Sequence, residues 1–128
     1  MKIEHLGLQV EQPVEMAEWY CKNFGFTIKR VFKNSAKNHF IADNSGNIML
    51  EIYNNQTVKT PDYANIDPLI LHLAFQCDDV KGTIKSLVAD GATLIVGPND
   101  SPDSDDLGML RDPWGLAIQL CKRVKPII

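Results

Sequence analysis

A short segment occurs twice in the chain, and this repeat constrains the fold more than any other feature. The first copy, HLGLQV, begins at His5, and the second, HLAFQC, begins at His72. Each copy has His, Leu, a small residue, an apolar residue and Gln in the same order. The chain has 3 histidines, and two of them take the same place in the two copies. An internal repeat of this kind predicts two structural units of the same design.

Each copy is followed by a helical pattern. Residues 13–24 begin with Pro, which is typical of the first helical turn, and Gly25 is placed to end the helix in a left-handed conformation. Residues 79–90 follow Asp78, and Asp78 or Asp79 can cap the start of this second helix. Gly91 is placed to end the second helix, as Gly25 is placed to end the first. Apolar spacing predicts that the helices bury Val14, Ala17, Cys21 and Phe24 in the first case and Val80, Ile84, Leu87 and Val88 in the second.

The segments after each helix favour β-structure. Residues 26–32 and 92–97 are β-prone, and each half then closes with a glycine-containing turn and a strand, at 44–53 and 112–121. The order is therefore β-α-β-β-β in each half. We predict an α+β fold with two βαβββ modules, whose curved mixed sheets enclose a concave site.

The expected boundaries follow from the same alignment. We predict one domain over 1–128, with module one at 1–53 and module two at 69–121. Between them lies a polar linker with two prolines, 54–68, and a tail covers 122–128.

Strand alternation places four polar side chains on equivalent faces. Successive strand residues face opposite sides of a sheet, so a polar residue between apolar ones points away from the apolar stripe. The two histidines are 67 positions apart and the two closing-strand polar residues are 68 apart. If the polar faces line one concavity, four residues converge there: His5, Glu51, His72 and Gln119.

These four side chains form a credible metal site. Two imidazole nitrogens, a carboxylate and an amide oxygen suit borderline divalent ions such as Zn, Ni, Co, Mn or Fe(II). The alternative is that they are polar residues of a cavity wall without an ion. Glu51 is also a candidate catalytic base, and Gln119 a candidate orienting group. Tyr53 and Met49 share the face of Glu51 and are candidates for substrate contact.

Four cations occur within nine residues of the first half. A charge run of this kind is usually the solvated edge of a hairpin, which is the interpretation we favour. The alternative is a collar for an anionic substrate. The cations are Lys29, Arg30, Lys33 and Lys37, and His39, which follows them, is predicted to be exposed.

Composition excludes several classes of protein. The net charge of −3 gives no basic footprint for nucleic acid, and no apolar run is long enough to cross a bilayer. The 3 cysteines are odd in number and form no CxxC motif, which indicates reduced thiols. We predict a cytoplasmic protein with a small-molecule substrate and with neither a nucleic-acid nor a membrane partner.

The repeated pattern resembles the vicinal oxygen chelate superfamily over nearly the whole chain. The features that carry the resemblance are the paired modules, a His opening each one, Glu51 closing the first, and DPWG at 112–115 before the last strand. This superfamily includes glyoxalase I, bleomycin-resistance proteins, fosfomycin-resistance enzymes, extradiol dioxygenases and methylmalonyl-CoA epimerase. The chain is most similar to bacterial glyoxalase I-like proteins.

The resemblance implies a ligand set and also a departure from it. The metal ligands of bacterial-type glyoxalase I are His, Glu, His and Glu at the four equivalent points. Here His5, Glu51 and His72 match, whereas Gln119 stands in place of the second Glu. Gln serves as a ligand elsewhere in the superfamily, but an amide cannot accept a proton at neutral pH. Glu51 would then be the obvious carboxylate base. The missing carboxylate would leave the metal site at a formal charge of about +1 and favour an anionic oxygen ligand.

Three functions follow from the resemblance. The first is a glyoxalase-like, metal-dependent lyase or isomerase, similar to lactoylglutathione lyase, acting on a small α-oxygenated substrate as a homodimer. The second is a metal-free binding protein of the bleomycin-resistance type. The third is an extradiol-type dioxygenase, which ranks last because the carboxylate of that family lies where this chain has Gln119.

Overall fold

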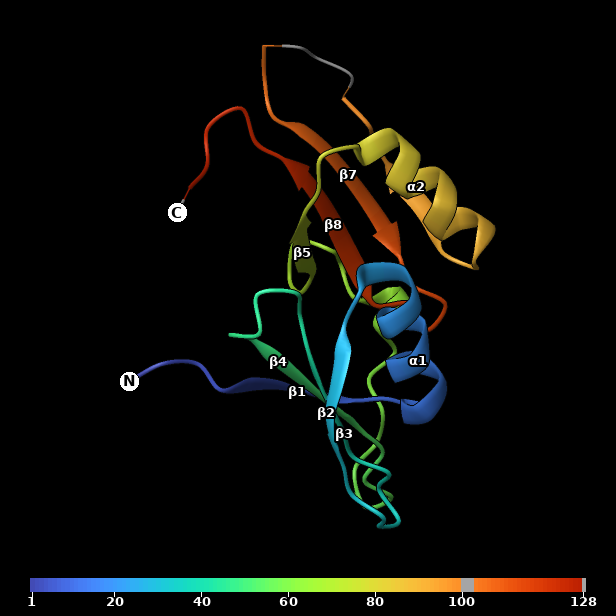
Figure 1. Ribbon diagram of the computed structural model, residues 1–128. Helices are drawn as coiled ribbons and strands as arrows, with labels where there is room; N and C mark the ends of the chain where they lie inside the picture. The colour runs from blue at the N-terminus through green and yellow to red at the C-terminus, as the bar shows by residue number, and fades with distance from the viewer. Residues whose placement is uncertain (100–102, 128) are drawn as a thin grey trace. The chain divides into compact units, whose positions relative to one another are not determined.

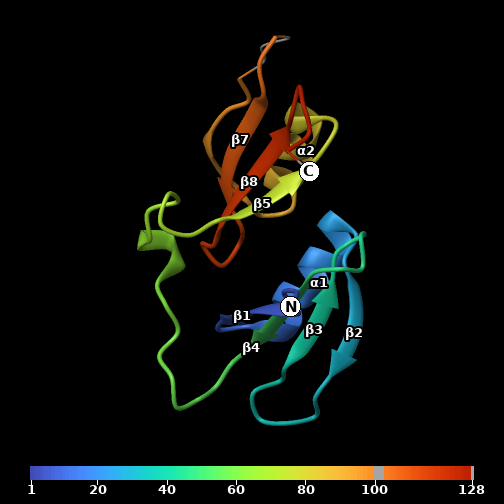
Figure 2. The same ribbon diagram turned by 90° about the vertical axis from the view of Figure 1, so that its left-hand side faces the viewer.

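The computed structural model describes residues 1–99 and 103–127. They fall into two compact units, one over 1–61 and the other over the described residues from 62 onward (Figures 1 and 2). Each unit contains a four-stranded mixed sheet and one α-helix. The predicted α+β fold of two paired modules is thereby confirmed. No helix within the described ranges is long and apolar enough to span a membrane.

The first unit has the strand order β1-β4-β3-β2. The β1 and β4 strands are parallel, and the remaining neighbours are antiparallel. Its elements are β1 (His5–Gln9), α1 (Pro13–Phe24), β2 (Thr27–Val31), β3 (His39–Ala42) and β4 (Met49–Tyr53).

The second unit repeats this topology with the order β5-β8-β7-β6. Again the first and last strands of the unit are parallel and the others antiparallel. Its elements are the short 3-10 helix η1 (Tyr63–Asn65), β5 (Leu73–Gln76), α2 (Val80–Ala89), β6 (Thr93–Val96), β7 (Asp106–Arg111) and β8 (Ala117–Lys122).

Helix α1 has the bounds that the sequence predicts. Pro13 lies in its first turn, and Gly25 ends it with a φ of 68°, a conformation that costs glycine nothing. The buried face differs in part from the prediction. Met16, Ala17 and Tyr20 are fully buried, whereas the predicted members Val14, Cys21 and Phe24 are only half-buried. The helix therefore presents to the sheet, chiefly to β3 and β4, a neighbouring stripe that also has helical spacing: Pro13, Met16, Ala17 and Tyr20.

Helix α2 is capped by Asp79, whose side chain accepts a hydrogen bond of 2.9 Å from the Gly82 amide. Its predicted core residues Val80, Ile84 and Leu87 are buried, but Val88 is 44% exposed. The helix packs closely on β7, because a Cβ at Gly108 would lie only 2.8 Å from Cδ1 of Ile84.

The DPWG turn before β8 fixes the start of the second unit. The buried carboxylate of Asp112 accepts hydrogen bonds from the amides of Trp114 and Leu116, both at 2.9 Å. Gly115 has a φ of 89°, and a Cβ there would lie 2.7 Å from the amide nitrogen of Ala64 in η1. Only glycine therefore fits where the turn meets η1.

Arg111 also holds η1 against β7 and β8. One guanidinium nitrogen donates to the carbonyls of Tyr63 and Gly115 at 2.8 and 2.9 Å, and the other donates to Ile66 at 3.0 Å. These bonds join the end of the predicted linker to the second unit.

The start of the predicted linker is held by the Gln of the first repeat. Gln9 is buried, and its amide nitrogen donates to the carbonyls of Asn55 and Val58, both at 3.1 Å. Its amide oxygen accepts from the Asn55 amide at 2.8 Å. The equivalent Gln76 is exposed, so the two glutamines of the repeat have different roles.

His39 is not exposed, and that prediction is wrong. Its side chain starts β3 and is only 8% exposed, with Nδ1 at 2.6 Å from the carbonyl oxygen of Lys37. The left-handed backbone of Lys37, with a φ of 50°, turns the hairpin so that this carbonyl is available.

Candidate functional site

The parallel pairing of β1 with β4 brings His5 and Glu51 together. Gly7 lies opposite Glu51 and His5 lies opposite Met49. Nε2 of His5 is 3.5 Å from Oε2 of Glu51, with side chains 34% and 19% exposed. On either side of Glu51, Leu50 and Ile52 are buried in the core, so the site lies on the sheet face opposite to α1.

Both members of this pair are oriented by a neighbour. The Glu4 carboxylate contacts Nδ1 of His5, and the Asn38 amide donates to Oε1 of Glu51 at 2.7 Å. When Nδ1 carries the proton, it donates to Glu4, and Nε2 then presents its lone pair toward Glu51. A carboxylate behind the imidazole is the usual support of a metal-ligating histidine. A lone pair and a carboxylate oxygen facing each other would be stabilised by a cation.

Gly7 on β1 lies beside two side chains of β4 on this face of the sheet. A Cβ at position 7 would lie 3.4 Å from Cε1 of Tyr53 and 3.7 Å from Oε2 of Glu51. These are ordinary van der Waals distances, so a small side chain at position 7 would contact the Glu51 carboxylate and the half-buried Tyr53 ring without displacing them.

In the second unit, Gln119 has the register of Glu51, whereas His72 lies just before the first strand and not within it. Gln119 on β8 lies opposite Ala74 on β5, as Glu51 lies opposite Gly7. His72 immediately precedes β5, and its Nδ1 is 2.7 Å from the carbonyl oxygen of Pro68. That contact assigns the proton to Nδ1 and leaves Nε2 with a free lone pair.

Gln119 receives a hydrogen bond from a thiol. Sγ of Cys121 donates to its amide oxygen at 3.4 Å. Burial raises the pKa of the Cys121 thiol, so the sulfur keeps its proton at neutral pH and remains a donor. This bond fixes the amide oxygen of Gln119 as an acceptor.

The side chains that each unit brings together supply a part of the ligand set of a divalent ion. The first unit joins one imidazole nitrogen and one carboxylate, and the second unit has an amide oxygen in the register of that carboxylate and an imidazole just before β5. Across residues 1–99 and 103–127, no group of three or more His, Cys, Asp or Glu side chains is placed to hold a metal. Each unit therefore offers half of the predicted ligand set, and the complete four-residue set stays a prediction.

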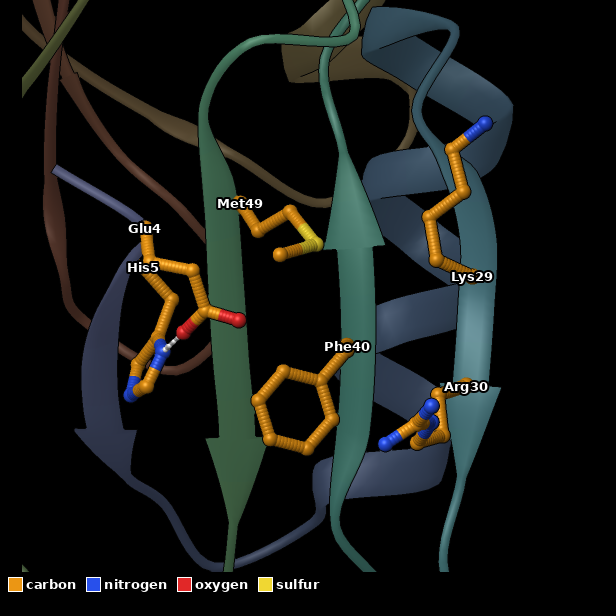
Figure 3. Close-up of a pocket in the computed structure, with 6 residues that line it drawn as sticks. All are labelled: Glu4, His5, Lys29, Arg30, Phe40 and Met49. Atoms are coloured by element: carbon orange, nitrogen blue, oxygen red, sulfur yellow. Dashed lines mark hydrogen bonds and ion pairs between the residues drawn. The ribbon is translucent and has the colours of Figure 1, made fainter. Parts of the chain in front are cut away.

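A pocket of about 310 Å³ opens beside His5 on this face. Figure 3 shows the pocket in front of the sheet, with Phe40 and Met49 as its apolar floor. The predicted substrate contact Met49 lines it. The lining residues are Glu4, His5, Lys29, Arg30, Phe40 and Met49.

Three residues of this region escaped the sequence prediction. Glu4 adjoins His5 in the sequence and could have been found as the partner of that imidazole. Phe40 lies opposite Glu51 in the β3–β4 pairing, so the same alternation would have found it once the register was known. Asn38 gave no signal, because it reaches Glu51 from the hairpin that precedes β3.

A family model decides the relationship of this chain to known proteins. The Glyoxalase/Bleomycin resistance protein/Dioxygenase superfamily model matches residues 2–120. The chain belongs to this superfamily. No curated protein matches its sequence.

Solved structures of glyoxalase-superfamily proteins share the fold. A glyoxalase/bleomycin resistance protein/dioxygenase family enzyme from Burkholderia phytofirmans PsJN has a TM-score of 0.77 at 18% identity, covering 97% of this chain and 100% of that one. TnmS3, an antibiotic binding protein from Streptomyces sp. CB03234, has a TM-score of 0.71 at 19% identity, with 96% of each chain covered. The fosfomycin resistance protein FosX from Listeria monocytogenes has a TM-score of 0.74 at 15% identity, covering 100% and 95%. At these identities the likeness concerns the fold alone.

Proposed function

We propose that this glyoxalase-superfamily protein is a metal-dependent lyase or isomerase that acts on a small substrate with adjacent oxygen atoms. The observation that carries the proposal is the pair of His5 Nε2 and Glu51 Oε2 at 3.5 Å, each member held from behind by a hydrogen-bonding neighbour. His5 and Glu51 would supply half of the ligands. His72 and Gln119 would supply the other half.

A bound divalent ion would stabilise negative charge that develops on the substrate oxygens. Glu51 is the base in this proposal, because its carboxylate can accept a proton at neutral pH whereas the Gln119 amide cannot. The hydrogen bond from Asn38 to Oε1 of Glu51 keeps Oε2 directed toward His5 and the substrate. Gln119 orients the substrate or binds the ion through its oxygen.

The test is metal binding by the full-length chain. We expect the purified protein to contain a divalent metal, and the EDTA-treated protein to take up Ni, Zn, Co or Mn. Metal at about 100 times its Kd adds about 2.7 kcal/mol to the free energy of unfolding, which raises Tm by several degrees. Absence of metal on elemental analysis, together with no change in Tm for any of the four ions, would refute the proposal.

A second candidate is a metal-free binding protein. The pocket floor of Phe40 and Met49 beside Lys29 and Arg30 could hold a ligand without an ion. A His5→Ala variant separates the two functions, with bleomycin as the probe. A sequestering protein keeps its affinity for bleomycin in the variant after EDTA treatment, whereas the metal-dependent function predicts no metal-free binding in either form. Dioxygenase chemistry ranks third, since the last strand carries Gln119 in place of a carboxylate.

We also propose that the chain acts as a homodimer in the cytoplasm, with residues 1–128 as one functional domain. Members of the superfamily are usually dimeric. Light scattering of the full-length protein should give about twice the chain mass of 14.3 kDa. A monomer mass at micromolar concentration would contradict the dimer.

A further inference from the structure

An irregularity in β2 controls which side chains line the pocket. The β2–β3 pairing places Ile28 opposite Ile41 and Arg30 opposite Phe40, so Lys29 is an extra residue in the ladder. In a regular strand, Lys29 and Arg30 would point to opposite faces. A bulge changes this alternation and redirects side chains, and here both cations line the pocket.

The two cations have no carboxylate partner. No Asp or Glu in the described parts of the chain lies within 4.0 Å of the charged nitrogens of Lys29 or Arg30. The one acidic residue that lines the pocket, Glu4, is already engaged by His5. The pocket therefore has an excess of positive charge at its β2 side, which an anionic ligand would complement.

Aromatic rings connect the two ends of the pocket. The His5 and Phe40 rings meet edge-to-face with centroids 5.5 Å apart, and Phe40 meets Phe32 in the same way at 5.7 Å. The guanidinium carbon of Arg30 lies 5.9 Å from the Phe32 centroid. In Figure 3 the Arg30 side chain extends toward Phe40, whereas Lys29 extends away from it along β2. Arg30 is thus the cation nearer to the middle of the pocket.

The second unit shows that the fold does not require these cations. Its β6–β7 pairing has the same irregularity between Leu94 and Val96, with Ile95 as the extra residue. The residues at the equivalent places are therefore two aliphatic ones, Ile95 and Val96. A bulge at this place is common to both modules, but the positive charge belongs to the first module alone.

We propose that Arg30, assisted by Lys29, binds an anionic group of the substrate, a carboxylate or a phosphonate, that is separate from the oxygens held near His5 and Glu51. This inference rests on the proposed function for the position of the reacting end. Strands β1 and β2 are three strand spacings apart, about 14 Å. The substrate is therefore an elongated small anion: its apolar middle lies over Phe40 and Met49, and its charged end lies at Arg30.

The experiment measures anion binding without metal. The EDTA-treated full-length protein, labelled with ¹⁵N, is titrated with phenylphosphonate, with benzoate and with the neutral benzamide, and amide shifts are followed by NMR. We expect both anions to shift amides of β2 and β3, and benzamide to bind more weakly. Loss of one partly exposed charged contact should raise Kd about fivefold in Arg30→Gln. The effect in Lys29→Gln should be smaller.

The matched control is Lys33→Gln, which removes the same charge from the hairpin beyond the pocket lining. An unchanged Kd in this variant supports the proposal, and the stronger of the two anions identifies the charged group. Equal affinity in wild type and Arg30→Gln overturns it, and so does an equal loss in Lys33→Gln. Because the titration contains no metal, it separates the two proposals. If the protein binds no metal but binds anions through Arg30, only the metal-dependent function is refuted. If it binds metal but binds anions equally well without Arg30, only the anion site is refuted.

Discussion

The two modules have the same framework but differ in charge at the positions that are predicted to be functional. Both have the same strand order, the same closing-strand register and a bulge at the same place in the second strand. Glu51 in the first module corresponds to Gln119 in the second, and Lys29 and Arg30 correspond to Ile95 and Val96. The first module therefore provides the charged groups, whereas the second provides neutral donors.

The largest expected effect comes from the histidine of the charged module. Replacement of His5 by Ala should lower metal affinity more than about 100-fold, beyond the loss expected for removal of an orienting neighbour. Competition with a chromophoric chelator measures the affinity, and His72→Ala is the equivalent change in the other module. If both variants bind metal as wild type does, neither histidine is a ligand.

The turn glycines before β4 and β8 should differ in their effect on stability. Gly115→Ala forces a left-handed alanine against η1 and should cost about 3 kcal/mol in the free energy of unfolding. Gly46→Ala has a similar φ of 69° but nothing within 4 Å of the new Cβ, and should cost about 1 kcal/mol. Urea unfolding measures both, and equal losses would show that the contact with Ala64 has no energetic effect.

Gln119→Glu should make the second module resemble the first. An added carboxylate should raise metal affinity about tenfold, since a unit charge near the ion contributes about 1 kcal/mol or more even in a solvated site. The same chelator competition measures the change, with glyoxalase turnover as a second readout. Glu51→Gln is the opposite change and should lower the affinity by a similar factor. Unchanged affinity in both variants would place these side chains away from the ion.

The Asn38→Ala variant tests whether the hydrogen bond from Asn38 orients the Glu51 carboxylate for metal binding. Loss of the 2.7 Å hydrogen bond frees the carboxylate, and we expect a loss of metal affinity near the lower end of the 10- to 100-fold range, about tenfold. Asn47→Ala removes an exposed asparagine from the turn between β3 and β4 and is the control. If the two variants have equal affinity, Asn38 does not orient Glu51.

The smallest effect concerns the ion pair between Asp105 and Arg123 of the second unit. The Arg123 guanidinium holds the pKa of Asp105 below its usual value, with help from the Val124 amide. Because the folded-state pKa is lowered, the pair stabilises the protein above the unfolded pKa and loses this contribution as pH falls through the folded value. Wild type should exceed Asp105→Asn in Tm at pH 7, and the difference should disappear at low pH. A difference that is constant with pH would exclude the ion pair as its cause.

The framework could be predicted from the sequence because it is repeated. The limits of α1 follow from Pro13 and Gly25, and the facing of Glu51 follows from strand alternation, whereas the cap of α2 was narrowed only to Asp78 or Asp79. Such patterns report local geometry, and two copies of each pattern confirm one another. The rotation of α1 toward Met16 and Tyr20 was not predictable in the same way, because this helix has two overlapping apolar stripes with helical spacing and spacing alone does not choose between them.

The surroundings of the site were less accessible to sequence reasoning. Asn38 and His39 depend on the course of one hairpin, whose left-handed Lys37 leaves no clear signal in the sequence. The bulge at Lys29 is also invisible, since its two adjacent cations would ordinarily be assigned to opposite faces. Contacts made by loops and irregular strands depend on the tertiary structure, and a periodic pattern of residues in the sequence does not reveal them.

The position of the bulge has a consequence for how this protein could diverge. Strand β2 lies at the edge of its sheet, and all five of its residues are exposed. Substitutions there disturb no buried packing, so mutation can exchange the side chains at positions 29 and 30 with little risk of unfolding the chain. Natural selection could thus change which small molecules the pocket accepts through two codons, while the residues on β1 and β4 stay as they are.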